Sequence, residues 1–188
     1  TASNNTAVGK AALLANTTGA SNTSVGYTSL DANTTGSNNV AIGQDALGAN
    51  TTASDNTAIG LSSLKLNVTG TANTAVGKDA LRANLADNNT AVGMDALTAN
   101  TTGADNVAFG SETMVSNTTG DANTALGRGA LASNSTADNN TAVGRSALLA
   151  NTTGTRNVAV GTYSLDANTT ANDNTAVGYN AATAITTG

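Results

Sequence analysis

Few side chains in this sequence are equipped for chemistry, and those few are carboxylates, hydroxyls, amides and seven cations. The chain has no Cys, His, Trp or Pro. This excludes disulfides, thiolate or imidazole metal ligands, and nucleophiles that a histidine base would activate. Paired carboxylates serve glycoside hydrolysis in some enzymes, but no segment here departs from its surroundings to build a cleft. We therefore expect a protein that is not an enzyme and that binds no cofactor.

The acidic residues with the most suggestive spacing are Asp79, Asp95 and Glu112, which follow one another at nearly equal intervals along the chain. If successive intervals stack as strands do, these carboxylates lie about 4.8 Å apart. Like charges at that distance repel unless a cation bridges them, and oxygen ligands suit calcium. A calcium site is one interpretation. The alternative is a solvated edge neutralised by Lys78 and Arg82, and the Gly-Gly-x-Gly-x-Asp pattern of calcium-binding β-rolls is missing.

Asparagine side chains form a second recurring set, because Asn-x-Ser/Thr is the acceptor sequence for N-glycans in secreted proteins. The same tripeptide is also ordinary turn chemistry, so both interpretations stay open. The candidate glycan sites are Asn16, Asn33, Asn50, Asn67, Asn100, Asn117, Asn134, Asn151 and Asn168.

All of these residues belong to one short unit that is written eleven times. A unit opens with an Asn at every seventeenth position, except that the interval between Asn73 and Asn89 is one position shorter. The consensus is N-T-A-V-G-x-x-A-L-x-A-N-T-T-G-x-x, and positions below are counted from its first Asn. A strict period this short is typical of a solenoid, in which each coil buries its apolar face by stacking on its neighbours. The units open at Asn5, Asn22, Asn39, Asn56, Asn73, Asn89, Asn106, Asn123, Asn140, Asn157 and Asn174.

Positions 2 to 5 predict a strand that ends in a turn. Position 4 is always apolar and position 2 is Thr or Val, so both lie on one face of a strand, which we expect to face inward. Position 3 is Ala in ten units and Ser24 in the other, and it lies on the opposite face. We interpret this alanine ladder as an oligomer interface; the alternative is a cramped turn within one rod. Gly at position 5 occurs in every unit, as expected where the backbone turns or packs closely. The ladder comprises Ala7, Ala41, Ala58, Ala75, Ala91, Ala108, Ala125, Ala142, Ala159 and Ala176.

The second half of the unit predicts another wall and a second turn. Leu at position 9, with Ala or Ser at positions 8 and 11, suits a strand or irregular extended arc, which we favour over a helical turn. Asn-Thr-Thr-Gly at positions 12 to 15 is turn chemistry, with Asn and Gly accepting left-handed backbone. No Asn-Gly or Asp-Gly pair occurs, which favours parallel coiling over hairpins.

The predicted fold is therefore an all-β parallel β-solenoid, or β-roll, of eleven 17-residue coils. It forms a single repeat domain over residues 1–188. Both ends fall inside a unit, and solenoids normally carry capping units. We expect uncapped ends, as in a piece of a longer protein or a subunit whose ends are covered by another subunit.

Composition narrows the partners. The net charge is −5, which argues against nucleic acid because phosphate recognition needs a concentrated basic surface. The chain contains no apolar run long enough to insert into a membrane. Aromatic residues are only 2% of the chain, so any core is thin and filled by small aliphatic side chains.

The repeat also resembles known fibre modules. Residues 38–43 read Asn-Asn-Val-Ala-Ile-Gly, which is similar to the Asn-Ser-Val-Ala-Ile-Gly motif in the head repeats of trimeric autotransporter adhesins. The longer unit resembles Asn-Thr-Ala-Val-Gly repeats of bacterial surface proteins and phage tail-fibre proteins. The resemblance implies a left-handed β-roll, a homotrimer and an extracellular location on a cell surface or virion fibre. The adhesin unit is shorter than the present one, which leaves the cross-section open.

Two functions follow as hypotheses. The first is a structural or adhesive rod of an extracellular fibre, associating with itself side by side or end to end into a filament, and meeting an unknown surface receptor or glycan. The alternative is an ice-binding β-solenoid that uses paired Thr columns such as Thr17-Thr18 and Thr101-Thr102. Adjacent strand residues point to opposite faces, so one rank alone would be outward, and Leu85-Ala86 interrupts it.

Overall fold

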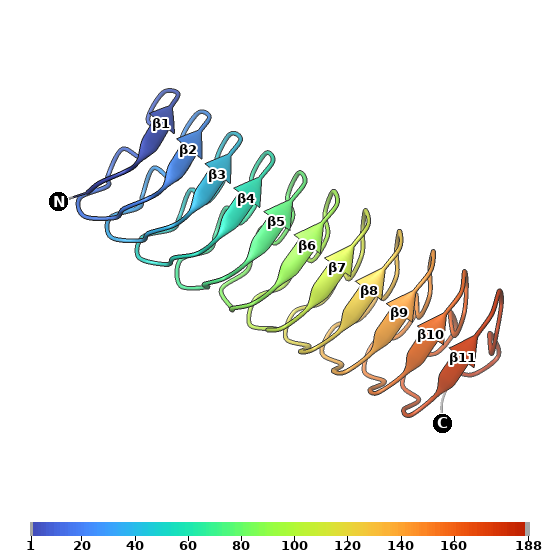
Figure 1. The fold of residues 1–188 in the computed structure, drawn as a ribbon. Coiled ribbons are helices and arrows are strands. Elements are labelled where there is room, and N and C mark those ends of the chain that lie inside the picture. The colour runs from blue at the N-terminus through green and yellow to red at the C-terminus, as the bar shows by residue number, and fades with distance from the viewer. Residues whose placement is uncertain (1, 187–188) are drawn as a thin grey trace.

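The computed structural model describes residues 2–186 and forms a single stack of coils in about ten turns (Figure 1). Eleven parallel strands form one sheet in sequential order, and none of the described residues is helical. The predicted all-β parallel β-solenoid is thus confirmed. The strands are β1 Thr6–Val8, β2 Thr23–Val25, β3 Val40–Ile42, β4 Thr57–Ile59, β5 Thr74–Val76, β6 Thr90–Val92, β7 Val107–Phe109, β8 Thr124–Leu126, β9 Thr141–Val143, β10 Val158–Val160 and β11 Thr175–Val177.

Each strand occupies positions 2 to 4 of its unit, and the register is the same along the whole sheet. Ala75 pairs with Ala91 and Val76 with Val92, although the unit that begins at Asn73 is shorter than the others by one residue. The one-residue deletion is therefore accommodated outside the strand. Identical positions stack on one another in every coil.

The second wall is an irregular arc of overlapping turns, with neither a strand nor a helix. In the coil of β6, the Ala96 N–H donates to Gly93 O and the Thr98 N–H to Asp95 O, each at 3.4 Å. The third residue of each turn has a positive φ, 57° at Asp95 and 52° at Leu97, as in a type II turn. These left-handed residues still bond along the stack, because the Asp95 N–H donates to Lys78 O and the Leu97 N–H to Thr113 O, both at 3.0 Å.

Leucine is an unusual residue at a left-handed position, and its burial explains why it is accepted. Left-handed backbone costs an L-residue about 1–2 kcal/mol. Full burial of a leucine side chain contributes about 1.5–3 kcal/mol, and Leu97 is 0% exposed. Burial therefore offsets the backbone cost, and the same geometry recurs at position 9 in every coil.

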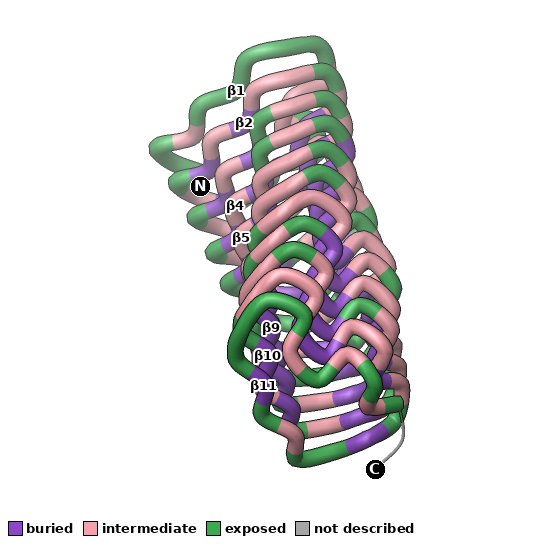
Figure 2. The backbone as a smooth tube through the Cα atoms, turned by 90° about the vertical axis from the view of Figure 1, so that its right-hand side faces the viewer, coloured by how far each residue is buried: buried purple, intermediate pink, exposed green. Residues whose placement is uncertain are grey.

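The core corrects the predicted direction of the strand faces. Ala at position 3 points inward and packs with Ala or Ser at position 8 and Leu at position 9, whereas positions 2 and 4 point outward. Figure 2 shows the buried segments stacked in register along the rod. The two walls lie so close together that a methyl group fills the strand side and leucine from the arc fills the rest. Positions 8 and 9 are both buried, because the left-handed residue alters the simple alternation expected of a strand.

Two ladders of buried asparagine close the cross-section. At position 1, the Asn123 N–H donates to Asn106 Oδ1 at 3.0 Å, and Asn123 Nδ2 donates to Ala137 O at 2.8 Å. At position 12, Asn117 Nδ2 donates to Asn100 Oδ1 at 2.8 Å and to the carbonyl of Gly120 at 3.0 Å. These amides satisfy backbone and side-chain groups that would otherwise be buried without partners.

The turn at positions 12 to 15 was predicted correctly, but its expected left-handed residues were not. Positive φ values fall at positions 5, 7, 9 and 17 instead. Asn at position 12 contributes the hydrogen bonds of its side-chain amide. Gly at position 15 is required because the neighbouring atoms leave no space for a side chain. A Cβ on Gly103 would lie 2.4 Å from Gly120 O and 2.6 Å from Asn100 Oδ1.

The short coil interrupts the position 12 ladder. Asn67 Oδ1 accepts a hydrogen bond from the Gly70 N–H, and Asn84 Nδ2 donates to Ala86 O. The ladder therefore breaks between Asn50 and Asn84, and it resumes where Asn100 Nδ2 donates to Asn84 Oδ1 at 2.7 Å. Asn50 Oδ1 is left buried without a hydrogen-bond partner among the described residues. The one-residue deletion thus leaves a local fault in an otherwise uniform stack.

Candidate functional site

The predicted alanine interface is wrong, because those side chains are inside the solenoid. From Ala41 to Ala159 the position 3 alanines are 0% exposed, and Ala176 is 5% exposed. Ala7, which belongs to the first coil, is exposed. The position 3 alanines therefore cannot form a surface of the solenoid.

The outward face of the sheet is instead made of positions 2 and 4, and we call it the strand face. Thr occupies position 2 in eight of the eleven units and Val in three, and no charged residue occurs at positions 2 to 4. In the inner coils Ile42, Ile59, Phe109, Leu126 and Val160 are each between 36% and 52% exposed. A continuous apolar and hydroxyl surface therefore runs along the rod. Position 4 comprises Val8, Val25, Ile42, Ile59, Val76, Val92, Phe109, Leu126, Val143, Val160 and Val177.

The candidate glycan sites are also contradicted by their surroundings. The amide nitrogen that would carry the sugar donates inside the core, as Asn151 Nδ2 does to Gly154 O at 2.9 Å. Only Asn16 is partly exposed, and its Nδ2 also donates, to Gly19 O at 2.9 Å. The tripeptide recurs for its hydrogen bonds within the fold. The other candidates, Asn33, Asn50, Asn67, Asn100, Asn117, Asn134 and Asn168, are all 0% exposed.

The three carboxylates considered for calcium stand in one column, and two of them, Asp79 and Glu112, are paired with cations. Asp79 lies 3.6 Å from both Lys78 Nζ and Arg82 Nε, and Glu112 Oε2 lies 3.2 Å from Arg128 Nη2. Within residues 2–186 no three His, Cys, Asp or Glu side chains gather as a metal site would require. For Asp79 and Glu112 this arrangement matches the alternative interpretation, a solvated edge on which the charges are paired.

Asp45 also occupies position 7, in the same column, and it accepts hydrogen bonds from two other coils. Its oxygens accept a hydrogen bond from the Thr28 hydroxyl and another from Lys65 Nζ at 3.0 Å. These two partners, the hydroxyl first, hold the pKa of Asp45 below its ordinary value. The three residues come from three successive coils, so the contacts connect the arc along the rod.

The Thr columns at positions 13 and 14 divide as alternation predicts. At position 13, Thr17 Oγ1 donates to Thr34 O and Thr101 Oγ1 to Thr118 O, each at 2.9 Å. Their hydroxyls are occupied by the backbone. At position 14, Thr102 and its equivalents are exposed, but the short coil has no residue there. One interrupted rank of exposed hydroxyls remains, and within it the Thr69 hydroxyl donates to Leu85 O at 3.1 Å.

The fold and these surfaces define a parallel β-solenoid repeat protein with an uncharged strand face. Residues 2–186 include no helix with the length and apolar character needed to traverse a bilayer. Comparison of the chain with protein-family models, curated proteins and solved structures finds no match. The surfaces themselves are therefore the basis for inferring function.

Reasoning from the consensus missed a further surface, because that surface consists of the positions at which the residue type varies from unit to unit. Positions 6, 7 and 10 lie on the arc, and we call them the variable arc. Six of the seven cations and all three tyrosines occur there. Their sequence signal is the departure from the repeat. These residues are Lys10, Lys65, Lys78, Arg82, Arg128, Arg145, Tyr27, Tyr163 and Tyr179.

Proposed function

We propose that this chain is a structural and adhesive rod segment of an extracellular fibre, such as a cell-surface adhesin or a phage tail fibre. In this proposal three copies associate side by side through the strand face, with left-handed coils. The trimer and the handedness come from the resemblance to adhesin head repeats. The single observation that supports lateral association is the uncharged strand face itself.

The strand face suits a second copy of the same chain better than water. A contiguous exposed apolar surface usually marks an interaction site, and half-exposed Ile42, Ile59, Phe109 and Leu126 lie along this one. Every coil presents the same two positions, so copies aligned in parallel would place equivalent residues together at every level. Closed rotational symmetry produces this kind of repeated match.

The arc remains available in such a bundle. Leu at position 9 of the arc packs on Ala at position 3 of the strand, so the outward side chains of the two walls point away from each other. Association through the strand face would cover Thr and Val. It would leave the charged and aromatic side chains of the variable arc facing solvent, where an adhesive surface must be.

The proposal is tested by charging the strand face. We expect the purified chain to have an oligomeric mass in light scattering, and Ile59→Glu combined with Leu126→Glu to reduce it to the mass of one chain. Buried carboxylates at an apolar interface are strongly disfavoured. The matched control is Leu14→Glu with Leu66→Glu, which adds equal charge to exposed leucines of the arc. A monomeric parent chain, or equal masses for both variants, contradicts lateral association.

Ice binding is the second candidate function. Because the strand face is regular, it suits ice better than the Thr columns at positions 13 and 14. Strands spaced about 4.8 Å apart and positions about 6.6 Å apart along each strand form a regular lattice of hydroxyl and methyl groups. Thr at position 2 supplies most of the hydroxyls. Thermal hysteresis by a monomeric chain, abolished in the Ile59→Glu and Leu126→Glu variant, would favour this function over the rod.

A further inference from the structure

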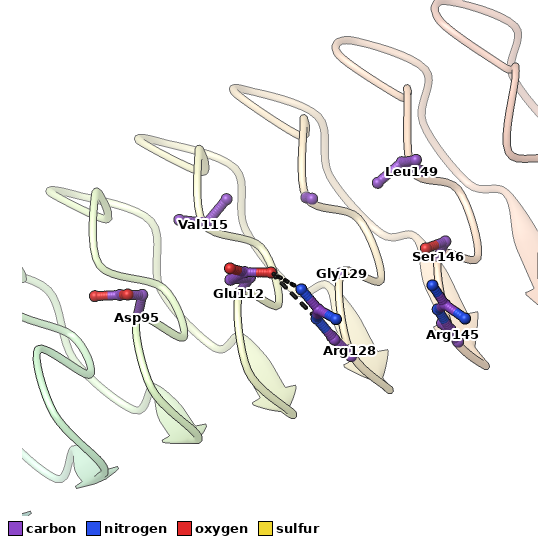
Figure 3. Close-up of a pocket in the computed structure, with 9 residues that line it drawn as sticks. Asp95, Glu112, Val115, Arg128, Gly129, Arg145, Ser146 and Leu149 are labelled. Carbon is purple, nitrogen blue, oxygen red and sulfur yellow. Dashed lines mark hydrogen bonds and ion pairs between the residues drawn. The ribbon is translucent and has the colours of Figure 1, made fainter.

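The variable arc is hollowed in more than one place, and one of these hollows is not required by the repeat. It lies beside the coils of β6 to β9, and its volume is about 440 Å³. Gly129 and Ala132 are among its lining residues. Val115 and Leu149 form its apolar side, and Arg128 and Arg145 lie opposite them (Figure 3). The hollow is within the size range of sites for small molecules.

The hollow exists at Gly129 because this residue has no side chain. Its φ of 68° is left-handed, but the other ten units carry a side chain at position 7, with similar values such as 57° at Asp95 and 55° at Ser146. A Cβ on Gly129 would meet only Ser146 Oγ at 3.7 Å and Leu149 Cδ1 at 3.9 Å, which are ordinary contacts. The fold therefore accepts a side chain at this position, and glycine there serves the surface.

The charges around the hollow are unequal. Arg128 is neutralised by Glu112, at 3.2 Å. Arg145 forms no ion pair with any residue in 2–186 and lies over the ring of Tyr163, 5.6 Å from its centroid. A guanidinium held in this way offers a planar set of donors to a carboxylate. The site thus has one cation available for one anionic group.

The remaining lining restricts what that anion can be attached to. Asp95 and Glu112 lie at one end. They would repel a polyanion, but their oxygens accept hydrogen bonds from hydroxyl groups. Val115 and Leu149 form an apolar side suited to the C–H face of a ring. A sugar ring with a single carboxylate has all three complementary features.

We propose that the hollow at Gly129 binds a carboxylate-bearing saccharide unit, with its carboxylate on Arg145, its hydroxyls toward Glu112 and Asp95, and its ring against Leu149. The site is independent of the lateral association proposed above, because all its residues belong to one chain and face away from the strand face. It gives the rod a defined ligand class in addition to a mechanical role.

The test is titration calorimetry with the methyl glycoside of glucuronic acid, compared with methyl glucoside and with acetate. We expect the glucuronide to bind about tenfold or more tightly than either comparator, because each comparator lacks either the charge-assisted bonds or the ring. Arg145→Gln and Gly129→Glu should each reduce this affinity by about tenfold or more. The first removes the cation, and the second fills the hollow with a carboxylate.

Matched controls are Arg82→Gln, in another coil of the arc, and Asn180→Glu, at position 7 of the last coil. Both should bind the glucuronide as the parent does, and circular dichroism should show all four variants folded. The proposal is overturned if the glucuronide does not saturate the protein, if glucoside or acetate binds equally well, or if folded Arg145→Gln and Gly129→Glu variants keep the parent affinity.

Discussion

At the scale of single residues, two glycines of this chain have opposite roles. Gly77 has φ +134°, and a Cβ placed on it would lie 2.5 Å from Gly93 O in the next coil. That separation is far shorter than any van der Waals contact, and the obstacle is backbone that cannot move without shifting the sheet. Gly129 meets no such obstacle, and its φ of 68° is one that side-chain-bearing residues adopt in the other coils. Glycine at position 5 is therefore structural, and glycine at Gly129 is a feature of the surface.

This difference predicts the effect of adding one methyl group. Gly77→Ala should lower the free energy of unfolding by about 2 kcal/mol or more, from the strained φ and the clash together. Gly129→Ala should change it by less than about 1 kcal/mol, because the left-handed backbone cost is partly offset by the reduced entropy of the unfolded chain. Urea titration followed by circular dichroism would measure both. Equal effects of the two substitutions would contradict this account.

Part of this residue-level picture could be predicted from the sequence. Invariant Gly at position 5 predicted a constrained backbone, and alternation correctly separated position 3 from positions 2 and 4. Which face is inward could not be predicted from apolarity alone, because Val is more apolar than Ala and yet the outward residue. The distance between the two walls decides which face of the strand points inward. That distance depends on leucines with positive φ, a backbone conformation that leucine rarely adopts and that the sequence does not indicate.

At the scale of the element, each coil combines an apolar core with buried, hydrogen-bonded asparagine side chains. The strand is only three residues long, so most of the coil bonds to its neighbours through turns and amide ladders. The sequence showed Asn-Thr-Thr as a turn but gave no sign that the amide is buried. Loss of one residue in the coil of β5 therefore disturbs the ladder, and Asn50 Oδ1 is without a partner.

Repairing this coil should stabilise the protein. Inserting a Thr between Leu85 and Ala86 restores the full length of the unit. It allows Asn67 Nδ2 to donate to Asn50 Oδ1 and Asn84 Nδ2 to donate to Asn67 Oδ1, as at the other steps of the ladder. Satisfying a buried acceptor contributes about 1–3 kcal/mol, so the melting temperature should rise by several degrees. The same insertion between Thr102 and Gly103, in a complete coil, should lower it. A lower melting temperature in the repaired chain would show that the short coil is not a fault.

At the scale of the whole molecule, the solenoid is a one-dimensional array in which each coil contacts its neighbours only. Each strand from β2 to β10 pairs with the strands immediately before and after it in the sequence. The number of coils is then a free parameter of the fold, and the surface of any one coil can vary without affecting distant coils. The variable arc uses this freedom, whereas the core positions do not.

Removal of one complete unit should therefore leave a folded, shorter rod. Deleting residues 106–122 joins equivalent positions of neighbouring coils, so the circular dichroism spectrum should keep its shape and the maximum dimension in small-angle scattering should fall by about 5 Å. Deleting residues 106–114 instead joins positions that do not correspond, and this variant should lose cooperative unfolding. Similar behaviour of the two deletions would mean that the register is not what holds the coils together.

The two candidate surfaces differ in the same way: the strand face consists of residues that repeat from unit to unit, and the hollow at Gly129 consists of residues that vary. The strand face is repeated in every unit, so its existence was predictable even though its residues were assigned to the wrong side. The hollow at Gly129 depends on four coils differing from one another at positions 6, 7 and 10. A consensus averages such differences away, and three-dimensional stacking was needed to bring them together.

The axial direction of the bonds between coils has a mechanical consequence. The bonds of the strand and arc, such as those from Leu97 N to Thr113 O and from Asp95 N to Lys78 O, connect one coil to the next. A pulling force applied along the rod therefore breaks the hydrogen bonds between coils sequentially, one coil at a time. Each detached coil would extend to roughly 60 Å in place of the approximately 4.8 Å it occupies in the stack. Such a molecule would yield in small, repeated steps and absorb work at each one.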